Sequence, residues 1–333
     1  MPTTRPIRNL FLLVSLILTA LACGLCDDTT ERATGRSVQV GWITLSEVFT
    51  TNGVTDISFS PHGVGYAAGG LGTVLKSTDN GRSWLPVPGA ISGVFTIFAV
   101  DDDNVFAASA RTLYRSSNGG SSWWSTDFDK GGSNIFGLYF ISPREGLMAK
   151  DGILRSTDWG STWVKALGDL GDGPACSLFS FLDPSNGYCA GGYTNGGVVP
   201  GGRYSSGFAI KTFDGGRTWS RLKLHTTQIT TIDFISPTTG YICNIDNEMY
   251  KTTDGGNSWN QVNRHVPGGQ LHFVDEAKGI VAGSSGIYYT DNGGMSWHKI
   301  YDSGVGPMRF INKTTGFFVG DSLIGKISLQ DED

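Results

Sequence analysis

Six short polar motifs hold residues of the types that could do chemistry. Each has an Asp or Asn, a Gly two residues later and a Trp five residues later. The pairs are Asp79 and Trp84, Asn118 and Trp123, Asp158 and Trp163, Asp214 and Trp219, Asp254 and Trp259, and Asn292 and Trp297. Paired carboxylates hydrolyse glycosides when they flank one bond, and several carboxylates on one loop can ligate calcium.

The spacing inside the motifs favours a structural role over both chemistries. An Asp or Asn side chain can bond nearby backbone N–H groups and so close a turn. The Gly supplies a positive φ at little steric cost. The Trp begins a new strand and brings a large apolar surface to bury. Each motif is therefore predicted to be a hairpin turn pinned to its own sheet.

The remaining polar residues offer little for catalysis or metal binding. Glutamate is scarce within the repeats, where Glu145, Glu248 and Glu276 occur, so a catalytic carboxylate pair is not expected. Asp101–Asn104 is a polar turn without the downstream Glu of a calcium loop. The His residues show no metal-ligand spacing. We therefore expect neither an enzyme nor a bound metal or cofactor.

The motifs recur at a period of about 40 residues, lengthened between Trp163 and Trp219 by one insertion. Ahead of each motif lie a first strand, usually with a Phe as in Ile57–Phe59, a polar turn, and a small apolar second strand such as Gly65–Gly69. The motif then joins the third strand to the fourth. This period, in a chain with 48 Gly, predicts an all-β propeller of four-stranded antiparallel blades. His272 lies in a first strand and is expected to be a hydrogen-bonded residue of the central channel.

The two ends of the repeat region are predicted to share one blade. After Trp297 only three strands follow, at residues 308–312, 316–320 and 326–329. Val40–Leu45, which contains a Trp, resembles a fourth strand with no first three before it. Pairing the ends closes the ring and removes both open edges. The prediction is one seven-bladed domain over residues 38–333.

The motif resembles the Asp box, or bacterial neuraminidase repeat, as in Lys251–Trp259. Coupled to Phe-x-x-x-x-x-Gly-Tyr-x-x-Gly, it resembles the photosystem II stability and assembly factor family over residues 38–331. The resemblance implies a seven-bladed propeller with structural boxes, no catalytic activity, and a protein or peptide partner such as a membrane-protein subunit. Sialidases also use Asp boxes, but their Phe/Tyr-Arg-Ile-Pro motif is absent here. A surface propeller that binds glycan or another ligand stays open as the alternative.

A partner is expected at the end of the propeller opposite the Asp boxes. Because strands alternate in direction, the loops between second and third strands and the links between blades share that end. The insertion at residues 192–207 is one such loop, and long loops on rigid scaffolds often carry function. Tyr and Arg are frequent interface anchors. The candidate partner-binding residues are Arg111, Arg203, Tyr204, Arg264 and His265.

The N-terminus has the order of a targeting segment. Arg5 and Arg8 precede an apolar run over Leu10–Leu21, which is too short to span a membrane. Residues 1–22 are predicted to be a signal peptide. Cleavage before Cys23 would expose a lipidated residue at the head of a polar tether, residues 23–37, although ordinary secretion also fits. The expected protein is an extracytoplasmic monomer, held by lipid on a bacterial membrane, with the outer one favoured.

Charge and cysteine usage add two further expectations. The formal net charge of −5 and the lack of a basic stripe exclude a nucleic-acid binder. Cys176 and Cys189 flank one predicted hairpin, and an oxidising compartment allows a disulfide between them. Their geometry cannot be read from the sequence, so the pairing stays open. Cys243 is expected to be a buried apolar residue.

The lipid anchor can be tested by changing one residue. Cys23→Ala should release the protein from membranes, because no acyl chain would then hold it. Metabolic labelling with palmitate, followed by membrane fractionation, measures both effects. A parent protein that takes up no label would contradict the anchor.

Overall fold

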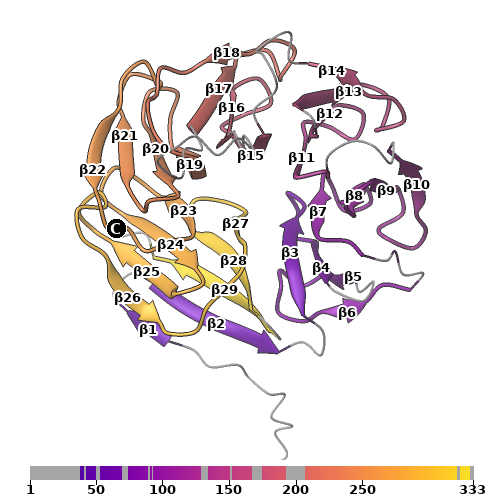
Figure 1. The fold of residues 1–333 in the computed structure, drawn as a ribbon. Coiled ribbons are helices and arrows are strands. Elements are labelled where there is room, and N and C mark those ends of the chain that lie inside the picture. Colours follow the sequence, from indigo (N-terminus) through magenta and orange to yellow (C-terminus); the bar gives the residue numbers. More distant parts are fainter. Residues whose placement is uncertain are drawn as a thin grey trace, which may run out of the picture. The chain divides into compact units, whose positions relative to one another are not determined.

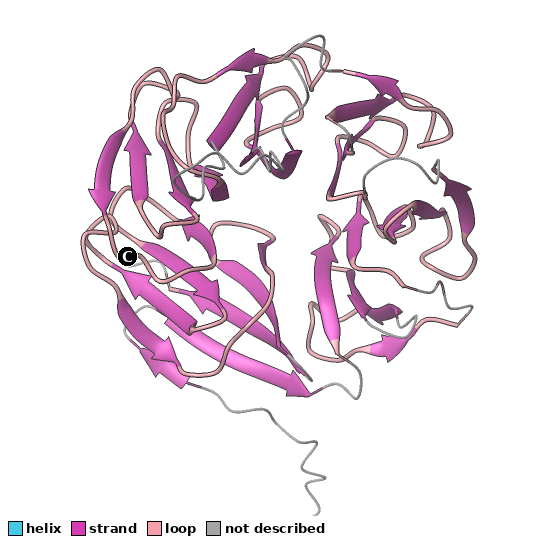
Figure 2. Cartoon of the chain, viewed as in Figure 1, coloured by secondary structure: helices cyan, strands magenta, loops and turns pink. Residues whose placement is uncertain are grey.

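A computed structural model describes residues 38–40, 43–49, 53–69, 74–88, 91, 93–128, 134–150, 152–166, 175–192, 207–320 and 323–330. These ranges contain strands, turns and loops but no helix (Figure 2). Accordingly, no helix in them is long and apolar enough to cross a bilayer. The predicted signal peptide, Cys23 and the tether lie outside the described residues.

Seven antiparallel sheets surround a central axis as the blades of a propeller (Figure 1). Blade 1 comprises β3 (Val54–Phe59), β4 (Gly65–Gly69), β5 (Val74–Ser77) and β6 (Leu85–Pro86). Blade 2 comprises β7 (Thr96–Ala99), β8 (Val105–Ala108), β9 (Thr112–Ser116) and β10 (Trp124–Asp127). Blade 3 comprises β11 (Gly137–Phe140), β12 (Gly146–Ala149), β13 (Ile153–Ser156) and β14 (Val164–Lys165). Blade 4 comprises β15 (Ala175–Phe181), β16 (Gly187–Gly192), β17 (Gly207–Thr212) and β18 (Ser220–Arg221).

Blades 5 and 6 repeat this order, and blade 7 joins the two ends of the domain. Blade 5 comprises β19 (Ile229–Phe234), β20 (Gly240–Asn244), β21 (Met249–Thr252) and β22 (Asn260–Asn263). Blade 6 comprises β23 (Gln270–Phe273), β24 (Gly279–Gly283), β25 (Gly286–Thr290) and β26 (His298–Tyr301). Blade 7 comprises β27 (Met308–Phe310), β28 (Thr315–Gly320), β29 (Leu323–Leu329), β2 (Ile43–Phe49) and β1 (Val38–Val40).

The ring closes in blade 7, as predicted, through pairing of β2 with β29. Its register runs from Ile43 opposite Leu329 to Phe49 opposite Leu323. The closing strand begins at Ile43 rather than Val40, opposite the last residue of β29, and it extends to Phe49 because β29 begins three residues earlier than predicted. Residues 38–40 instead form β1, a fifth strand at the outer edge.

Strand direction gives the propeller two chemically different ends. The first-to-second-strand turns and the Asp boxes lie at one end, which we call the box end. The second-to-third-strand loops and the links between blades lie at the other, the loop end. This assignment follows from the antiparallel order of every blade.

Stacked aromatic rings hold successive blades together. Phe234 of blade 5 stacks on Tyr188 of blade 4 with ring centroids 3.4 Å apart, and Trp259 packs edge-on against the same Phe234 at 6.0 Å. Gly240 pairs with Phe234, and a Cβ there would overlap the ring. Comparable stacks join Phe106 to Phe140, Tyr241 to Phe273, and Phe59 to Phe317. The small second-strand residues read from the sequence are thus required by close blade packing.

The innermost strands have one edge without a strand partner, and polar side chains of the preceding blade bond part of it. Asp56 Oδ2 accepts the N–H of Ile97 at 3.1 Å, and Asp233 Oδ2 accepts the N–H of Phe273 at 2.6 Å. Ser58, Thr231 and Gln270 accept N–H groups of Ala99, Leu271 and Met308 in the same way. Backbone donors at an otherwise open edge are thereby satisfied.

Each Asp box is held by its own side chains. Asp254 Oδ1 accepts the Thr252 hydroxyl at 2.8 Å and the Ser258 N–H at 2.9 Å, while Oδ2 accepts the Ser258 hydroxyl at 2.6 Å. Gly255 and Gly256 take φ of 69° and 83°, as the turn requires. The bonds from Ser258 hold the pKa of Asp254 down, at about 2. Asn292 makes the corresponding bonds without a charge.

The box bonds predict a defined effect on stability. Asp254→Ala should lower the melting temperature by a few degrees because three hydrogen bonds are lost, whereas Asp254→Asn should lower it less. Since the pKa of Asp254 in the folded protein lies below the usual 3.8, the ionised carboxylate stabilises the fold above about pH 4. This stabilisation is lost as the pH falls toward 2 and the carboxylate is protonated. The difference between wild type and Asp254→Asn should shrink over that window in thermal unfolding. A difference independent of pH would show that the charge plays no part.

Candidate functional site

The predicted partner-binding residues that the structure describes lie in two separate places at the loop end. Arg111 lies between β8 and β9 in blade 2, whereas Arg264 and His265 lie in the link from blade 5 to blade 6. Blades 3, 4 and 5 lie between them along the chain. Arg203 and Tyr204 lie outside the described residues. The structure therefore does not bring Arg111 together with Arg264 and His265.

A cavity of about 460 Å³ opens at the loop end between blades 4 and 5. It is lined by Gly207, at the start of β17, and by residues 221–226, which leave β18. Arg221, Lys223 and His225 are exposed and alternate with Leu222 and Leu224. The Arg221 guanidinium lies over the Phe208 ring at 5.2 Å, and Gly207 N–H donates to Thr226 O at 2.7 Å. This basic cavity adjoins the predicted insertion.

Sequence reasoning missed the basic cavity. Its only local signal is the alternation of Arg221, Lys223 and His225 directly after the box residue Trp219. That alternation places three basic side chains on one side of an extended segment. The contact between this segment and β17 depends on strand pairing within blade 4, so the spacing of residues along the sequence did not reveal it.

A polar network adjoins the cavity through Thr226. Asn244 donates to the Thr226 hydroxyl at 2.9 Å and to Glu248 Oε2 at 2.9 Å. Tyr250 donates to the same Glu248 oxygen at 2.8 Å, and Gln261 donates to Oε1 at 3.0 Å. These bonds, led by that from Tyr250, lower the pKa of Glu248, so it is ionised at neutral pH. Arg264, predicted as a binding residue, donates instead to Gln261 Oε1 at 3.0 Å.

The other glutamates of the repeats are engaged in ion pairs. Glu145 pairs with Arg155 at 2.8 Å and with Arg217 at 3.6 Å. Glu276 pairs with Lys251 at 2.8 Å. Among the described residues no group of three or more His, Cys, Asp or Glu could hold a metal ion.

The cysteines settle one open question. Cys176 and Cys189 form a disulfide between β15 and β16 with their Cα atoms 6.0 Å apart, a usual separation. Cys243 is a buried free thiol, as predicted, and burial raises its pKa to about 12.

An Asp–His pair lies on the innermost strands of blades 5 and 6. His272 Nδ1 is 3.6 Å from Asp233 Oδ2, and the imidazole stacks on Phe310 at 3.8 Å. His272 Nε2 is buried without a hydrogen-bond partner, so the ring is held by the contact of Nδ1 with Asp233 and by the stack on Phe310. Burial raises the pKa of Asp233 to about 7 and lowers that of His272 to about 4.

Comparison with known proteins agrees with the geometry. Residues 194–328 match the family described as photosynthesis system II assembly factor YCF48. The fold is similar to YCF48 bound to a D1 peptide, with a TM-score of 0.67 and 15% identity over 89% of this chain and 99% of that one. It is also similar to YCF48 from Cyanidioschyzon merolae, with a TM-score of 0.62 and 17% identity over 88% and 98%.

An enzyme shares the fold as well. A GH74 xyloglucanase from Xanthomonas campestris has a TM-score of 0.57 and 14% identity over 81% of this chain and 56% of that one. No curated protein matches the sequence. Taken with its Asp boxes and seven blades, the chain is a seven-bladed BNR-repeat propeller that resembles the photosystem II assembly factors.

The Asp233–His272 pair predicts a pH-dependent variant effect. Burial raises the pKa of Asp233 in the folded protein, so the protonated carboxyl favours the native state below about pH 4. This contribution to stability is lost as the pH rises toward 7, because the carboxyl must then ionise while buried. Asp233→Asn keeps an acceptor for the Phe273 N–H and removes this loss. The variant should therefore gain stability relative to wild type between pH 4 and 7, and the gain should level off above. Chemical denaturation across that range measures it, and a constant difference would contradict the raised pKa.

Proposed function

We propose that this protein is a non-catalytic, extracytoplasmic scaffold that binds a peptide segment of a partner protein at its loop end. The observation that carries the proposal is the likeness over nearly the whole propeller to YCF48 in complex with a D1 peptide. The partner we favour is an extracytoplasmic segment of a membrane-protein subunit, which a lipid on Cys23 would bring within reach.

The basic cavity is the part of the loop end that best fits a peptide. Arg221, Lys223 and His225 offer exposed donors, and Leu222 and Leu224 lie between them along an extended segment. An acidic side chain or a terminal carboxylate would pair with the guanidinium of Arg221, which the Phe208 ring helps to orient. Arg203 and Tyr204, which the sequence places in the insertion between β16 and β17, are proposed to contribute to the same binding.

A catalytic role is less well supported by the carboxylates. Glycoside hydrolysis needs one carboxylic acid and one free carboxylate or an equivalent nucleophile. Glu145 and Glu276 are held by Arg and Lys partners, and both oxygens of Glu248 accept hydrogen bonds. Tyr250 donates a hydrogen bond to Glu248, as a Tyr nucleophile beside a Glu would. A sialidase would also need a cluster of Arg side chains there, whereas the described residues place Arg264 beside the pair, bonded to Gln261. The alternative is a glycan-binding propeller, favoured by the likeness to the xyloglucanase.

The test is an array of overlapping synthetic peptides from the extracytoplasmic segments of the source organism's membrane proteins. Wild type should bind a discrete set of acidic peptides. The variant Arg221→Ala/Lys223→Ala should lose about tenfold or more in affinity, as expected when charge-assisted bonds are removed. Arg203→Ala/Tyr204→Ala should weaken the same peptides.

Two comparisons make this test decisive. Arg82→Ala removes the same type of charge at the box end and should bind as wild type does. Folded Asp254→Ala should also retain binding. If either of these variants loses binding while Arg221→Ala/Lys223→Ala binds normally, the functional surface lies at the box end and the proposal is wrong. Release of reducing sugar from xyloglucan by the wild type would contradict the non-catalytic assignment.

A further inference from the structure

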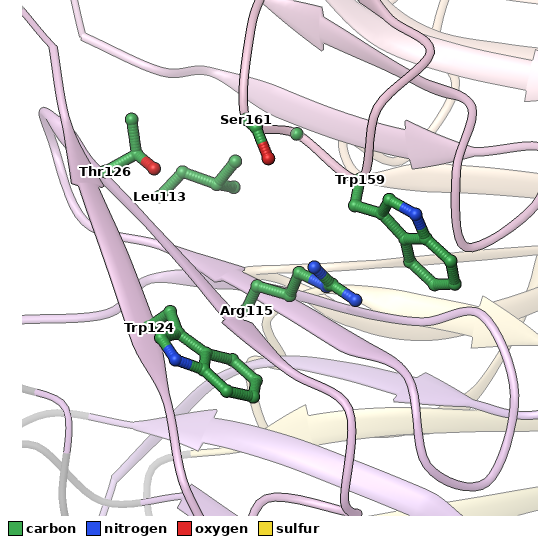
Figure 3. A pocket seen from close by; sticks show the side chains of 7 residues that line it. Leu113, Arg115, Trp124, Thr126, Trp159 and Ser161 are labelled. Atoms are coloured by element: carbon green, nitrogen blue, oxygen red, sulfur yellow. The ribbon is translucent and has the colours of Figure 1, made fainter.

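A second cavity, of about 310 Å³, lies at the box end between blades 2 and 3. Arg115 and Leu113 on β9, Trp124 and Thr126 on β10, and residues 159–161 in the third Asp box line it. Figure 3 shows the Arg115 side chain reaching between the indoles of Trp124 and Trp159. Its Cζ is 4.4 Å from the Trp159 ring centroid and 5.9 Å from that of Trp124. The volume is at the small end of the range for ligand pockets, about 300–1,000 Å³.

Arg115 departs from the structural role that the residue at its position has in three other boxes. The first residue is a cation in five of the six boxes, and Lys76, Lys211 and Lys251 each bond the next blade. Lys76 Nζ donates to Gly119 O at 3.1 Å, and Lys211 Nζ donates to Gly255 O at 3.2 Å. Arg115 makes no such bond and packs over an indole instead. Blade packing therefore does not explain the presence of its guanidinium.

Trp159 is the second departure from the repeat. It occupies the fifth position of its box, where φ is 68°. Four other boxes have Gly at this position and one has Asn80, with φ from 58° to 70°. A bulky side chain with positive φ is a genuine outlier, and such strain is concentrated at functional sites. Here it sets an indole against Arg115.

The cavity has cationic character that the described part of the chain does not neutralise. Arg115 forms no ion pair there, its Nε is buried without a hydrogen-bond partner, and burial lowers its pKa. Arg144, exposed in the first turn of blade 3, lies 6.0 Å from the same Trp159 ring. Two guanidiniums beside the same indole, without a carboxylate partner among the described residues, favour an anionic ligand.

We propose that this cavity binds a hexuronate residue of an acidic polysaccharide. The carboxylate would take the guanidinium edge of Arg115, which is suited to bidentate pairing. The Trp124 side chain is 58% exposed and presents a flat apolar surface for the C–H face of a pyranose ring. Thr126 and Ser161 place hydroxyls beside the cavity for the ring hydroxyls.

A uronate fits these walls better than an acidic peptide does. The lining consists of a guanidinium, two indoles, two hydroxyls and the Leu113 side chain around Gly160. A flat indole beside a guanidinium matches a ligand that carries its charge on a flat ring. This site lies at the end away from the basic cavity and stands independently of the proposed function.

The experiment titrates the full-length protein with an oligogalacturonate, followed by tryptophan fluorescence and calorimetry. Wild type should bind it and should not bind a neutral cello-oligosaccharide. Arg115→Gln and Trp124→Ala should each weaken binding by about tenfold or more. Leu85 takes the place of Trp124 in blade 1 and is 70% exposed, so Leu85→Ala is the matched control. Arg82→Gln controls for a lost charge at the box end.

Both controls should bind as wild type does. The proposal is overturned if wild type fails to bind oligogalacturonate or binds the neutral oligosaccharide equally well. It is also overturned if the controls weaken binding as much as Arg115→Gln. Tighter, Arg115-dependent binding of an oligoglutamate peptide would assign the cavity to acidic peptides instead.

Discussion

Closure of the ring is the constraint on which the rest of this structure depends. A row of twisted sheets packed face to face leaves an open edge at each end. Pairing of β2 with β29 along seven residues removes both edges at once. It also fixes the position of blade 1 against blade 7, where Phe59 stacks on Phe317 at 4.0 Å. Every stack between blades can then persist because the circle has no end from which to fray.

Within the closed ring, apolar packing and hydrogen bonds to the backbone occupy different regions. Aromatic stacks and small second-strand residues fill the space between blades, away from water. Nearer the axis, Asp56, Thr231 and Asp233 bond backbone N–H groups of the following blade. Burial of Asp233 for this purpose raises its pKa, a cost of placing a carboxyl where a backbone donor needs an acceptor.

The repeat makes departures from it informative. Lys76 and Lys211 each bond a carbonyl of the next box, so the same position in blade 2 has a defined structural expectation. Arg115 does not make this bond, and the fifth residue of the next box is Trp159, whose positive φ is one that Gly usually adopts. A propeller thus provides its own internal controls, since six boxes share one local geometry. Residues that the geometry does not need are those to consider for binding.

The two ends of the propeller can therefore serve different ligands. The loop end has the basic cavity and an inserted loop, whereas the box end has turns whose polar groups are largely used in their own hydrogen bonds. The cavity beside Arg115 is an exception at that end because two boxes depart from the pattern. Variation at loop positions leaves closure untouched, which allows one scaffold to present different surfaces.

The sequence by itself determined the blade number, the strand order, the structural role of the boxes and the closure by an N-terminal strand. These follow from local physics, because the bonds of Asp254 and Thr252 lie within one short turn and repeat at a regular period. Only the tertiary structure decided the disulfide, the Asp233–His272 contact and both cavities. The residues that meet there belong to different strands or neighbouring blades, and their distances depend on sheet pairing and ring closure. Spacing along the chain could place Arg111 and Arg264 at one end and in different blades, but it could not reveal which residues of that end border a cavity.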